Sequence, residues 1–311
     1  MRKQSIEPKD LIGVFPVPPL ARRRTAGHEI DFEASRKIAD HIMAGGPSRL
    51  MYGGNAFLYH ITLAEYGALL DWLTGFPDSA WCIPSAGPSY GRAMDQAPML
   101  RGRGFPAVML LPCGDPRDAF GLERGYREFA EGAATPLIVY VKEENNFGGN
   151  IAAGIEAIGR LVDDGVCIAI KYAVVRKDPA KDDYLTALLD RVDRKHVISG
   201  IGERPAIVHL EQWKLSGFTT GSGCIAPRLS QTILEMCLRG EFREAEAVRA
   251  KFLAFEDIRD AWGPAKVLHA GVAEAGIAET GPTAPFVSEL SVAEKAEAGS
   301  AARELMLANR G

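Results

Sequence analysis

Short apolar runs alternate along the chain with longer segments in which apolar positions recur every three to four residues. Continuous apolar runs are typical of strands buried on both faces of a parallel sheet, and the longer period is typical of helices that cover such a sheet. One helical stripe consists of Ile151, Ile155, Ile158 and Val162. The runs predict strands at residues 11–17, 49–53, 81–85, 107–113, 136–141, 166–171, 197–200 and 217–221.

Eight strand and helix alternations predict a closed (β/α)8 barrel, the α/β fold known as the TIM barrel. Thr62 and Glu65 form a capping-box pattern, which marks the start of the second helix. An open doubly wound sheet would be expected to carry a Gly-x-Gly-x-x-Gly turn after its first strand. That motif is absent here, which favours the barrel.

The C-terminal part of the sequence stays helical after the eighth unit. Helices are predicted at about residues 241–262, 264–275 and 291–307. We therefore expect a barrel over residues 1–235 and an extension of about three helices over residues 236–311, packed on the barrel. In this extension Ala245, Val248, Phe252 and Phe255 form an apolar stripe that either covers the barrel or meets another subunit.

Composition narrows the function classes. The 311 residues are 47% hydrophobic with a net charge of −4, which gives no electrostatic basis for a nucleic-acid partner. No apolar stretch has the length of a signal peptide or a membrane helix, so we expect a cytoplasmic protein without a membrane partner. The five cysteines lack a Cys-x-x-Cys pair and the six histidines lack ligand spacing, so we expect reduced cysteines and no metal.

The clearest candidate for chemistry is Lys171, the last residue of the sixth apolar run. An ionisable group at the end of a buried strand either opens into a site or must be paired. Desolvation lowers the pKa of a lysine, and its neutral amine is a nucleophile toward carbonyl groups. The alternative is a structural salt bridge at the barrel mouth.

Active sites of such barrels lie at the carboxyl ends of the strands. Tyr140, on the strand before Lys171, could relay protons, or it could be a half-buried aromatic with a structural hydroxyl. Gly53 and Gly54 could let backbone amides approach a carboxylate, or form only a turn. The turn over residues 221–223 could hold phosphate, although a glycine turn is weak evidence. His60 is interpreted as a surface residue at a helix entry.

Several stretches resemble the dihydrodipicolinate synthase / N-acetylneuraminate lyase family of class I aldolases and dehydratases. Residues 53–66 resemble its Gly-Thr-Thr-Gly-Glu loop and the helix start that follows it. Residues 136–140 resemble the strand that bears the family's tyrosine, and Ile170 and Lys171 occupy its Ile-Lys position. Residues 264–268 and 281–285 resemble its closing helix and proline-containing turn. The resemblance covers nearly the full chain.

The resemblance implies a barrel that is commonly a homotetramer and that uses no cofactor beyond its own lysine. It implies that Lys171 forms a Schiff base with a keto acid and that Tyr140 relays protons. Substrate-binding roles follow for Gly53, Gly54, Asn55, Ala56, Gly200 and Thr219.

The chain also departs from the family pattern. Asn55 replaces a threonine hydroxyl of the proton relay, and Ala56 replaces a glycine. Cys113 stands where many members have a tyrosine that reaches into a neighbouring subunit, and the synthases' arginine after the fifth strand is missing. We hypothesise that Lys142 replaces this arginine as the carboxylate ligand. A true lysine-pathway synthase is therefore not expected.

The sequence thus predicts a Schiff-base lyase, an aldolase or a dehydratase, that acts on a small 2-keto acid as a homo-oligomer, a tetramer or a dimer. Two alternatives stay open. One is a barrel enzyme that binds a phosphorylated sugar at Gly221, Ser222 and Gly223. The other is a barrel that has lost catalysis and binds a small ligand.

Overall fold

The computed structural model describes residues 1–285 and 287–311. It confirms the predicted (β/α)8 barrel with C-terminal helices. The eight predicted strands are all present, most of them with tighter bounds. The sixth ends one residue later than predicted, at Tyr172, and the third is divided into two short segments that reach Ala86. The strands are β1 (Val14–Pro16), β2 (Arg49–Met51), β3 (Trp81–Ile83) with β4 (Ser85–Ala86), β5 (Val108–Leu110), β6 (Leu137–Val141), β7 (Cys167–Tyr172), β8 (Val197–Ser199) and β9 (Phe218–Thr220).

Two compact units make up the chain. The first contains Met1–Gly13, Thr62–Ile201 and Val208–Phe218, and the second contains Val14–Ile61, Gly202–Ile207 and Thr219–Gly311.

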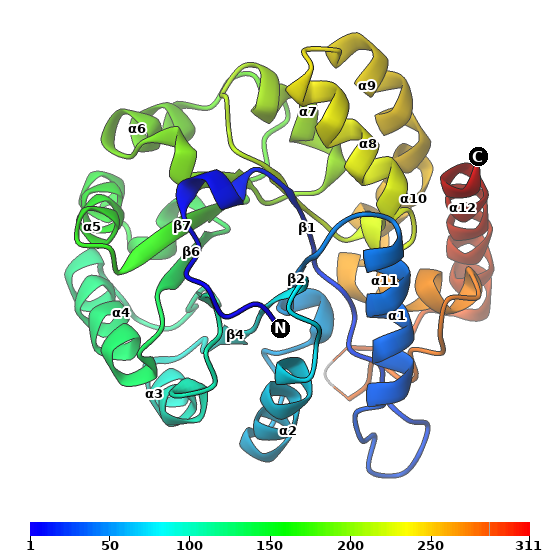
Figure 1. Cartoon of the computed structure of the whole chain (residues 1–311), viewed down its shortest axis with the longest axis horizontal. Helices are drawn as coiled ribbons and strands as arrows, with labels where there is room; N and C mark the ends of the chain where they lie inside the picture. Colours follow the sequence, from blue (N-terminus) through cyan, green and yellow to red (C-terminus); the bar gives the residue numbers. More distant parts are fainter. Residues whose placement is uncertain (286) are drawn as a thin grey trace. The chain divides into compact units, whose positions relative to one another are not determined.

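Parallel strands in sequence order form the sheet of the first unit. From β4 to β8 each strand pairs with the next one along the chain, and Phe218 of β9 continues the order beside Ser199 of β8. Helices cover the outer side of these strands (Figure 1). They are α2 (Leu63–Thr74), α3 (Tyr90–Leu100), α4 (Ala119–Ala133), α5 (Ile151–Asp163) and α6 (Asp183–Arg191).

The helices of the first unit follow the predicted patterns. Thr62 and Glu65 form the expected capping box at the start of α2. In α5 the predicted stripe is buried at Ile155 and Ile158, whereas Ile151 and Val162 are only half-buried at its edges. The alternation of strand and helix patterns therefore accounts for the architecture around β6 and β7.

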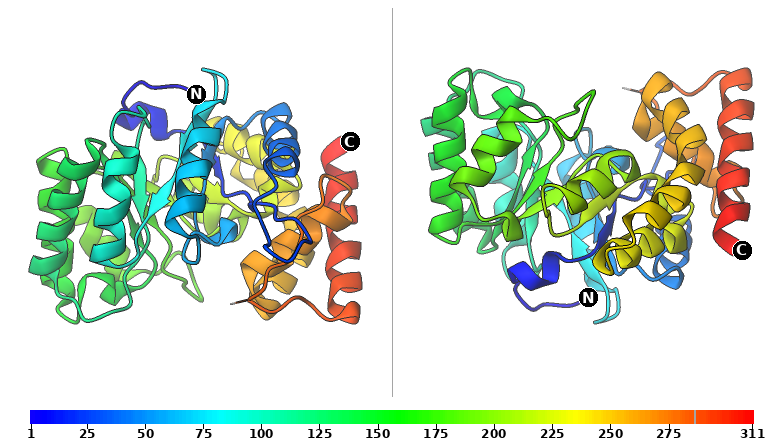
Figure 2. Two further views of the ribbon diagram at one scale, coloured as in Figure 1. Left: turned by 90° about the horizontal axis from the view of Figure 1, so that it is seen from below. Right: turned by 90° about the horizontal axis from the view of Figure 1, so that it is seen from above.

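The second unit contains β1, β2, α1 (Phe32–Ala44) and the helices that follow β9. In place of one helix over residues 241–262 it has two, divided by a 3-10 turn at Ala250–Phe252. Ala245, Phe252 and Phe255 are buried inside this unit, so this part of the predicted stripe covers the protein's own core. Figure 2 shows α12 lying beside α11. The helices are α8 (Pro227–Leu238), α9 (Phe242–Arg249), α10 (Leu253–Trp262), α11 (Pro264–Glu274) and α12 (Val292–Arg310); α7 (Glu203–Glu211) contributes to both units.

In residues 1–285 and 287–311, no helix combines the length and the apolar character needed to cross a bilayer. The five cysteines, which include the buried Cys82 and Cys167, are all free.

Candidate active site

Lys171 is the central residue of the candidate site in the first unit. It lies near the carboxyl end of β7, in register with Tyr140 of β6 on one side and Ile198 of β8 on the other. Its side chain is buried, with only 6% of the residue exposed. The Nζ atom lies 4.2 Å from the centre of the Tyr140 ring. The structure therefore brings together the two residues predicted to carry the chemistry.

The electrostatic environment of Lys171 is that of an isolated buried amine. Burial lowers its pKa from 10.5 to about 7, because desolvation disfavours the ammonium form. Among the described residues, Lys171 forms no ion pair that would oppose this shift. The salt bridge considered from the sequence is therefore not observed, and about half of the amine is unprotonated near neutral pH.

Gly200, the residue after β8, leaves room for the lysine. A Cβ atom on Gly200 would lie 3.0 Å from Cγ of Lys171 and 2.7 Å from the carbonyl oxygen of Tyr172. These distances are too short for ordinary packing, so a larger residue would displace the lysine stem or the end of β7. This gives a physical reason for glycine at a predicted site position.

Tyr140 and Lys142 belong to the end of β6. Tyr140 is half-buried, as expected for a residue that opens toward a barrel mouth. Lys142 follows the strand directly and is exposed, while its backbone amide donates to Oδ1 of Asn146. The local structure thus leaves the Lys142 ammonium group accessible to a ligand.

The glycine loop lies in the second unit, where it follows β2 as a short 3-10 turn, η2 (Gly54–Ala56). The side-chain amide of Asn55 donates to the carbonyl of Val17 at 2.8 Å, so this side chain anchors the loop. Among the described residues, the amides of Gly54 and Asn55 have no acceptor. Gly53 and Ala56 are buried at the two ends of the turn. The loop therefore presents two backbone donors.

The turn after β9 is largely occupied by the protein's own groups. Thr219 is buried in the strand, and Oγ1 of Thr220 accepts a hydrogen bond from the amide of Gly223 at 2.7 Å. Arg259 donates to Oγ of Ser222 at 3.0 Å. A Cβ atom on Gly221 would lie 2.3 Å from the Arg259 guanidinium. These contacts support a structural role for the turn rather than phosphate binding.

Four buried polar residues were not identified from the sequence. Asp182 accepts hydrogen bonds from Tyr172 and Arg176 in the first unit. Glu203 and Glu256 are buried in the second unit, and so is His269, whose Nε2 atom lies 2.8 Å from the carbonyl oxygen of Asn55. Only Asp182 left a signal in the sequence, as a capping aspartate before α6.

No group of three or more His, Cys, Asp or Glu side chains in the described part of the chain is placed to bind a metal ion. His60 is exposed, in agreement with its interpretation as a surface residue.

The architecture defines a class, the (β/α)8 barrels, and this chain carries a buried lysine near the end of one strand. Solved structures narrow it further. Dihydrodipicolinate synthase from Bacillus clausii shares 19% identity at a TM-score of 0.80, over 94% of this chain and 97% of that chain. YagE is a prophage protein of the dihydrodipicolinic acid synthase family from Escherichia coli K12, solved in complex with pyruvate. It shares 17% sequence identity at a TM-score of 0.79, over 95% of this chain and 99% of that chain. PhdJ bound to a substrate intermediate shares 17% sequence identity at a TM-score of 0.78, over 99% of both chains.

The chain therefore has the fold of the dihydrodipicolinate synthase family over its full length, as the resemblance in the sequence predicted. No family model and no curated protein matches the sequence itself. The likeness is one of fold, at identities below a fifth.

Proposed function

We propose that the protein is a Schiff-base-forming lyase, an aldolase or a dehydratase, that acts on a 2-keto acid. The observation that carries the proposal is the buried Lys171, free of ion pairs among the described residues, with its Nζ atom 4.2 Å from the Tyr140 ring. The shared fold supports the proposal, since one solved neighbour was crystallised with pyruvate and another with a substrate intermediate.

The chemistry follows from the amine. The lone pair of the neutral Lys171 attacks the keto carbon, a C–N bond forms, and the carbonyl oxygen leaves as water. When a C–C bond of the substrate breaks, the resulting iminium nitrogen accepts its electron pair and an enamine forms. In a dehydration the iminium instead accepts the electron pair of a C–H bond next to the imine carbon as a base takes that proton, and the enamine then expels a protonated hydroxyl group as water. The Tyr140 hydroxyl is the proposed proton carrier for these steps. The covalent imine takes the place of a cofactor.

The substrate-binding roles are part of the same proposal. Gly53, Gly54, Asn55 and Ala56 form the loop whose amides would bind the carboxylate, in keeping with the two free donors. Lys142 would add a positive charge, and Gly200 and Thr219 would line the site. Asn55 has no hydroxyl group, so it cannot supply the one that the usual relay contains, and its side-chain amide instead holds Val17. This supports a substrate other than that of the lysine pathway.

We also propose that the protein is a homo-oligomer, a dimer or a tetramer. Tyr90 at the start of α3 and Phe120 at the start of α4 are 55% and 77% exposed. A contiguous exposed apolar patch is typical of an interaction surface, and α3 and α4, which carry these two residues, pack against each other.

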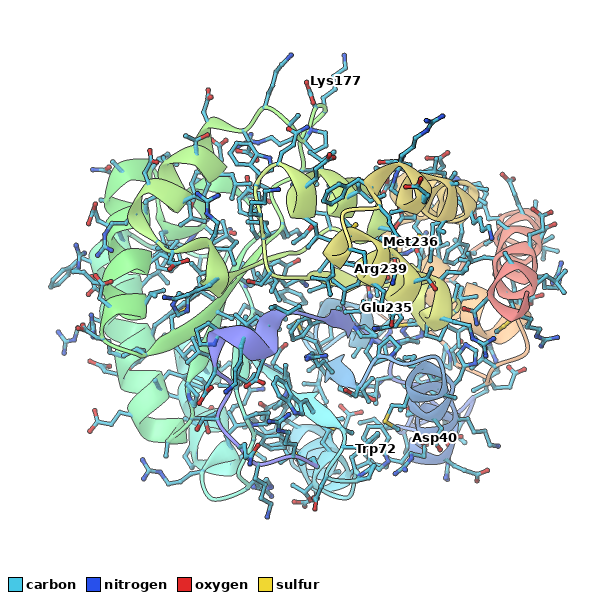
Figure 3. All side chains as sticks on the ribbon, turned by 45° about the horizontal axis from the view of Figure 1, so that its top comes forward. Asp40, Trp72, Lys177, Glu235, Met236 and Arg239 are labelled. Carbon is cyan, nitrogen blue, oxygen red and sulfur yellow. The ribbon has the colours of Figure 1, made fainter. Side chains whose placement is uncertain are left out.

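Borohydride reduction in the presence of pyruvate and a panel of longer 2-keto acids, followed by peptide mass analysis, tests the lyase proposal. We expect a stable adduct on Lys171 and none in the Lys171→Met variant. Lys177→Met is a control, because Lys177 lies in the loop after β7, is exposed and points away from the ribbon (Figure 3).

Other outcomes of the same experiment would contradict the proposal. No adduct with any keto acid, together with thermal stabilisation by phosphate, would indicate the phosphosugar enzyme. Keto-acid binding without an adduct or turnover would indicate a ligand-binding barrel.

A further inference from the structure

His269 of α11 is a buried histidine that contacts the glycine loop of the second unit. Only 2% of the residue is exposed. Its Nε2 atom lies 2.8 Å from the carbonyl oxygen of Asn55, in the middle of η2. A carbonyl oxygen can only accept, so Nε2 carries the hydrogen. This contact links a helix of the C-terminal part to a loop 214 residues earlier in the chain.

The ring of His269 also contacts the residue that ends the turn. Its centroid lies 4.8 Å from that of Phe57, at an interplanar angle of 35°. Phe57 has a φ of 53°, a left-handed conformation that costs free energy for a residue with a bulky side chain. Such a conformation persists only where the surroundings hold it. The contact with His269 is thus placed where the loop needs support.

The neutral form of His269 can donate a hydrogen bond to the Asn55 carbonyl at all physiological pH values. Burial lowers its pKa to about 4, so the ring is neutral at physiological pH and its single N–H is fixed on Nε2 by the Asn55 carbonyl. The Thr280 hydroxyl donates to the backbone carbonyl of His269 at 2.8 Å and ties that residue to the segment after α11.

The loop is therefore held from two sides. The Asn55 side chain donates to Val17 after β1, and the Asn55 backbone carbonyl accepts from His269. Both bonds orient the peptide groups next to the free amides of Gly54 and Asn55. The Asn55 carbonyl shares its peptide plane with the amide of Ala56, which donates to Gly53, so loss of the bond from His269 would loosen this turn and with it the adjoining amides of Gly54 and Asn55.

We propose that His269 is a positioning residue for substrate binding, which fixes the carboxylate-binding amides of Gly54 and Asn55 through the Asn55 carbonyl and the Phe57 ring. The proposal rests on the proposed keto-acid lyase function and adds to it a role for α11. His269 acts through the loop and touches no reacting atom.

His269→Phe and His269→Gln separate the two contacts. Phe keeps a ring against Phe57 without a donor, whereas Gln restores a donor to the Asn55 carbonyl. In borohydride trapping with pyruvate we expect His269→Phe to raise the half-saturating pyruvate concentration by about tenfold, the effect of one lost hydrogen bond. The trapping rate at saturation should change by less than about twofold, because Lys171 itself is unaffected. His269→Gln should lie closer to the wild type.

His41→Phe is the matched control. His41 also donates from Nε2 to a backbone carbonyl, that of Ile225 at 3.0 Å, but it lies in α1 and away from η2. His41→Phe should leave the half-saturating pyruvate concentration unchanged, even if it lowers the melting temperature by as much as His269→Phe does. A merely structural role for His269 would give the same result for both variants and would overturn the proposal.

Amide hydrogen exchange gives a readout independent of catalysis. Exchange over residues 53–58 should become faster in His269→Phe and stay unchanged in His41→Phe. If the wild type forms no adduct at all, the lyase proposal fails. Unchanged exchange of this loop in His269→Phe would refute the positioning role on its own.

Discussion

At the scale of single residues, the surroundings of Lys171 determine how readily its amine is protonated. The amine is buried beside an aromatic ring, and the absence of a side chain on Gly200 leaves space for its stem. Desolvation then lowers the pKa of Lys171 to about 7 without help from a neighbouring cation. The same burial has a cost, because an amine that prefers to be neutral in the folded state destabilises that state wherever the unfolded chain is protonated.

Lys171→Met should therefore stabilise the protein. Between about pH 7 and 10.5 the unfolded state binds a proton that the folded state does not, so the stability of the wild type rises with pH across this window. At pH 7 we expect the variant to gain about 1–4 kcal/mol in free energy of unfolding, and less as the pH approaches 10. Urea denaturation at several pH values measures this gain.

Lys177→Met changes an exposed loop position, so its free energy of unfolding should stay within about 0.5 kcal/mol of the wild-type value. Equal stability of Lys171→Met and the wild type at every pH would show that Lys171 is solvated and charged in the native state.

At the scale of elements, the segment between β7 and α6 is fastened to the strand that carries the lysine. Asp182 is fully buried at the N-cap of α6, where it accepts from the amide of Leu185, from Arg176 at 2.8 Å and from the hydroxyl of Tyr172. Burial alone would raise the pKa of Asp182, but the hydrogen bonds from Arg176 and Tyr172 lower it overall. Asp182 thus joins the start of a helix to the residue next to Lys171.

Asp182→Asn should cost about 2–4 kcal/mol in free energy of unfolding at pH 7, because it leaves Arg176 without its buried partner. A carboxyl with a lowered pKa contributes stability above its ordinary pKa of 3.8 and loses it as the pH falls below that value. The difference in free energy of unfolding between the wild type and Asp182→Asn should therefore become smaller at acidic pH. Asp178→Asn, at an exposed position of the same loop, serves as the control in chemical denaturation.

A pair of buried acidic residues joins α7 to α10. Glu203 accepts from the Ser230 hydroxyl, and Glu203 and Glu256 lie within hydrogen-bonding reach of each other. The Oε2 atoms of both have no donor among the described residues, an arrangement that one shared proton would satisfy. Burial first, and then repulsion from Glu203, raise the pKa of Glu256 to about 8, although Arg259 opposes the shift.

Glu256→Gln should flatten the pH dependence of stability. From about pH 4.5 to 8 the folded wild type keeps a proton that the unfolded chain releases, so its stability falls as the pH rises. The glutamine variant carries a permanent donor and should gain at least about 1.4 kcal/mol over the wild type between pH 5 and 8. Thermal unfolding at pH 5 and pH 8 measures the difference in stability between the two proteins. The same change in stability with pH in the wild type and in Glu256→Gln would disprove the shared proton.

The elements themselves were predictable where local signals are strong. Buried parallel strands read as apolar runs and Thr62 caps its helix in the usual pattern, so these features followed from the sequence. The division at Ala250–Phe252 was missed because no glycine or proline interrupts the helical pattern there. Lys171 and Tyr140 were found because strand ends converge in a barrel. His269 was not, because its contact with Asn55 arises only from tertiary packing.

At the scale of the whole molecule, the surface of the first unit carries apolar area that a single copy leaves uncovered. Tyr90 and Phe120 are both more than half exposed and lie on helices that pack against each other. A pocket of about 600 Å³ opens between these helices, and its walls include Tyr90, Leu111 and Cys113. The missing family tyrosine would have stood at Cys113, so this pocket marks the place where the chain departs from the family pattern.

We expect this surface to meet a second copy of the chain. Phe120→Glu places a charge in the proposed interface and should lower the mass measured by light scattering after size exclusion, because an unpaired charge is strongly disfavoured in a buried contact. Val292→Glu, at a position that is 90% exposed on α12, should leave the mass unchanged. A wild type that is monomeric at every concentration, or an equal effect of both variants, would contradict the expectation.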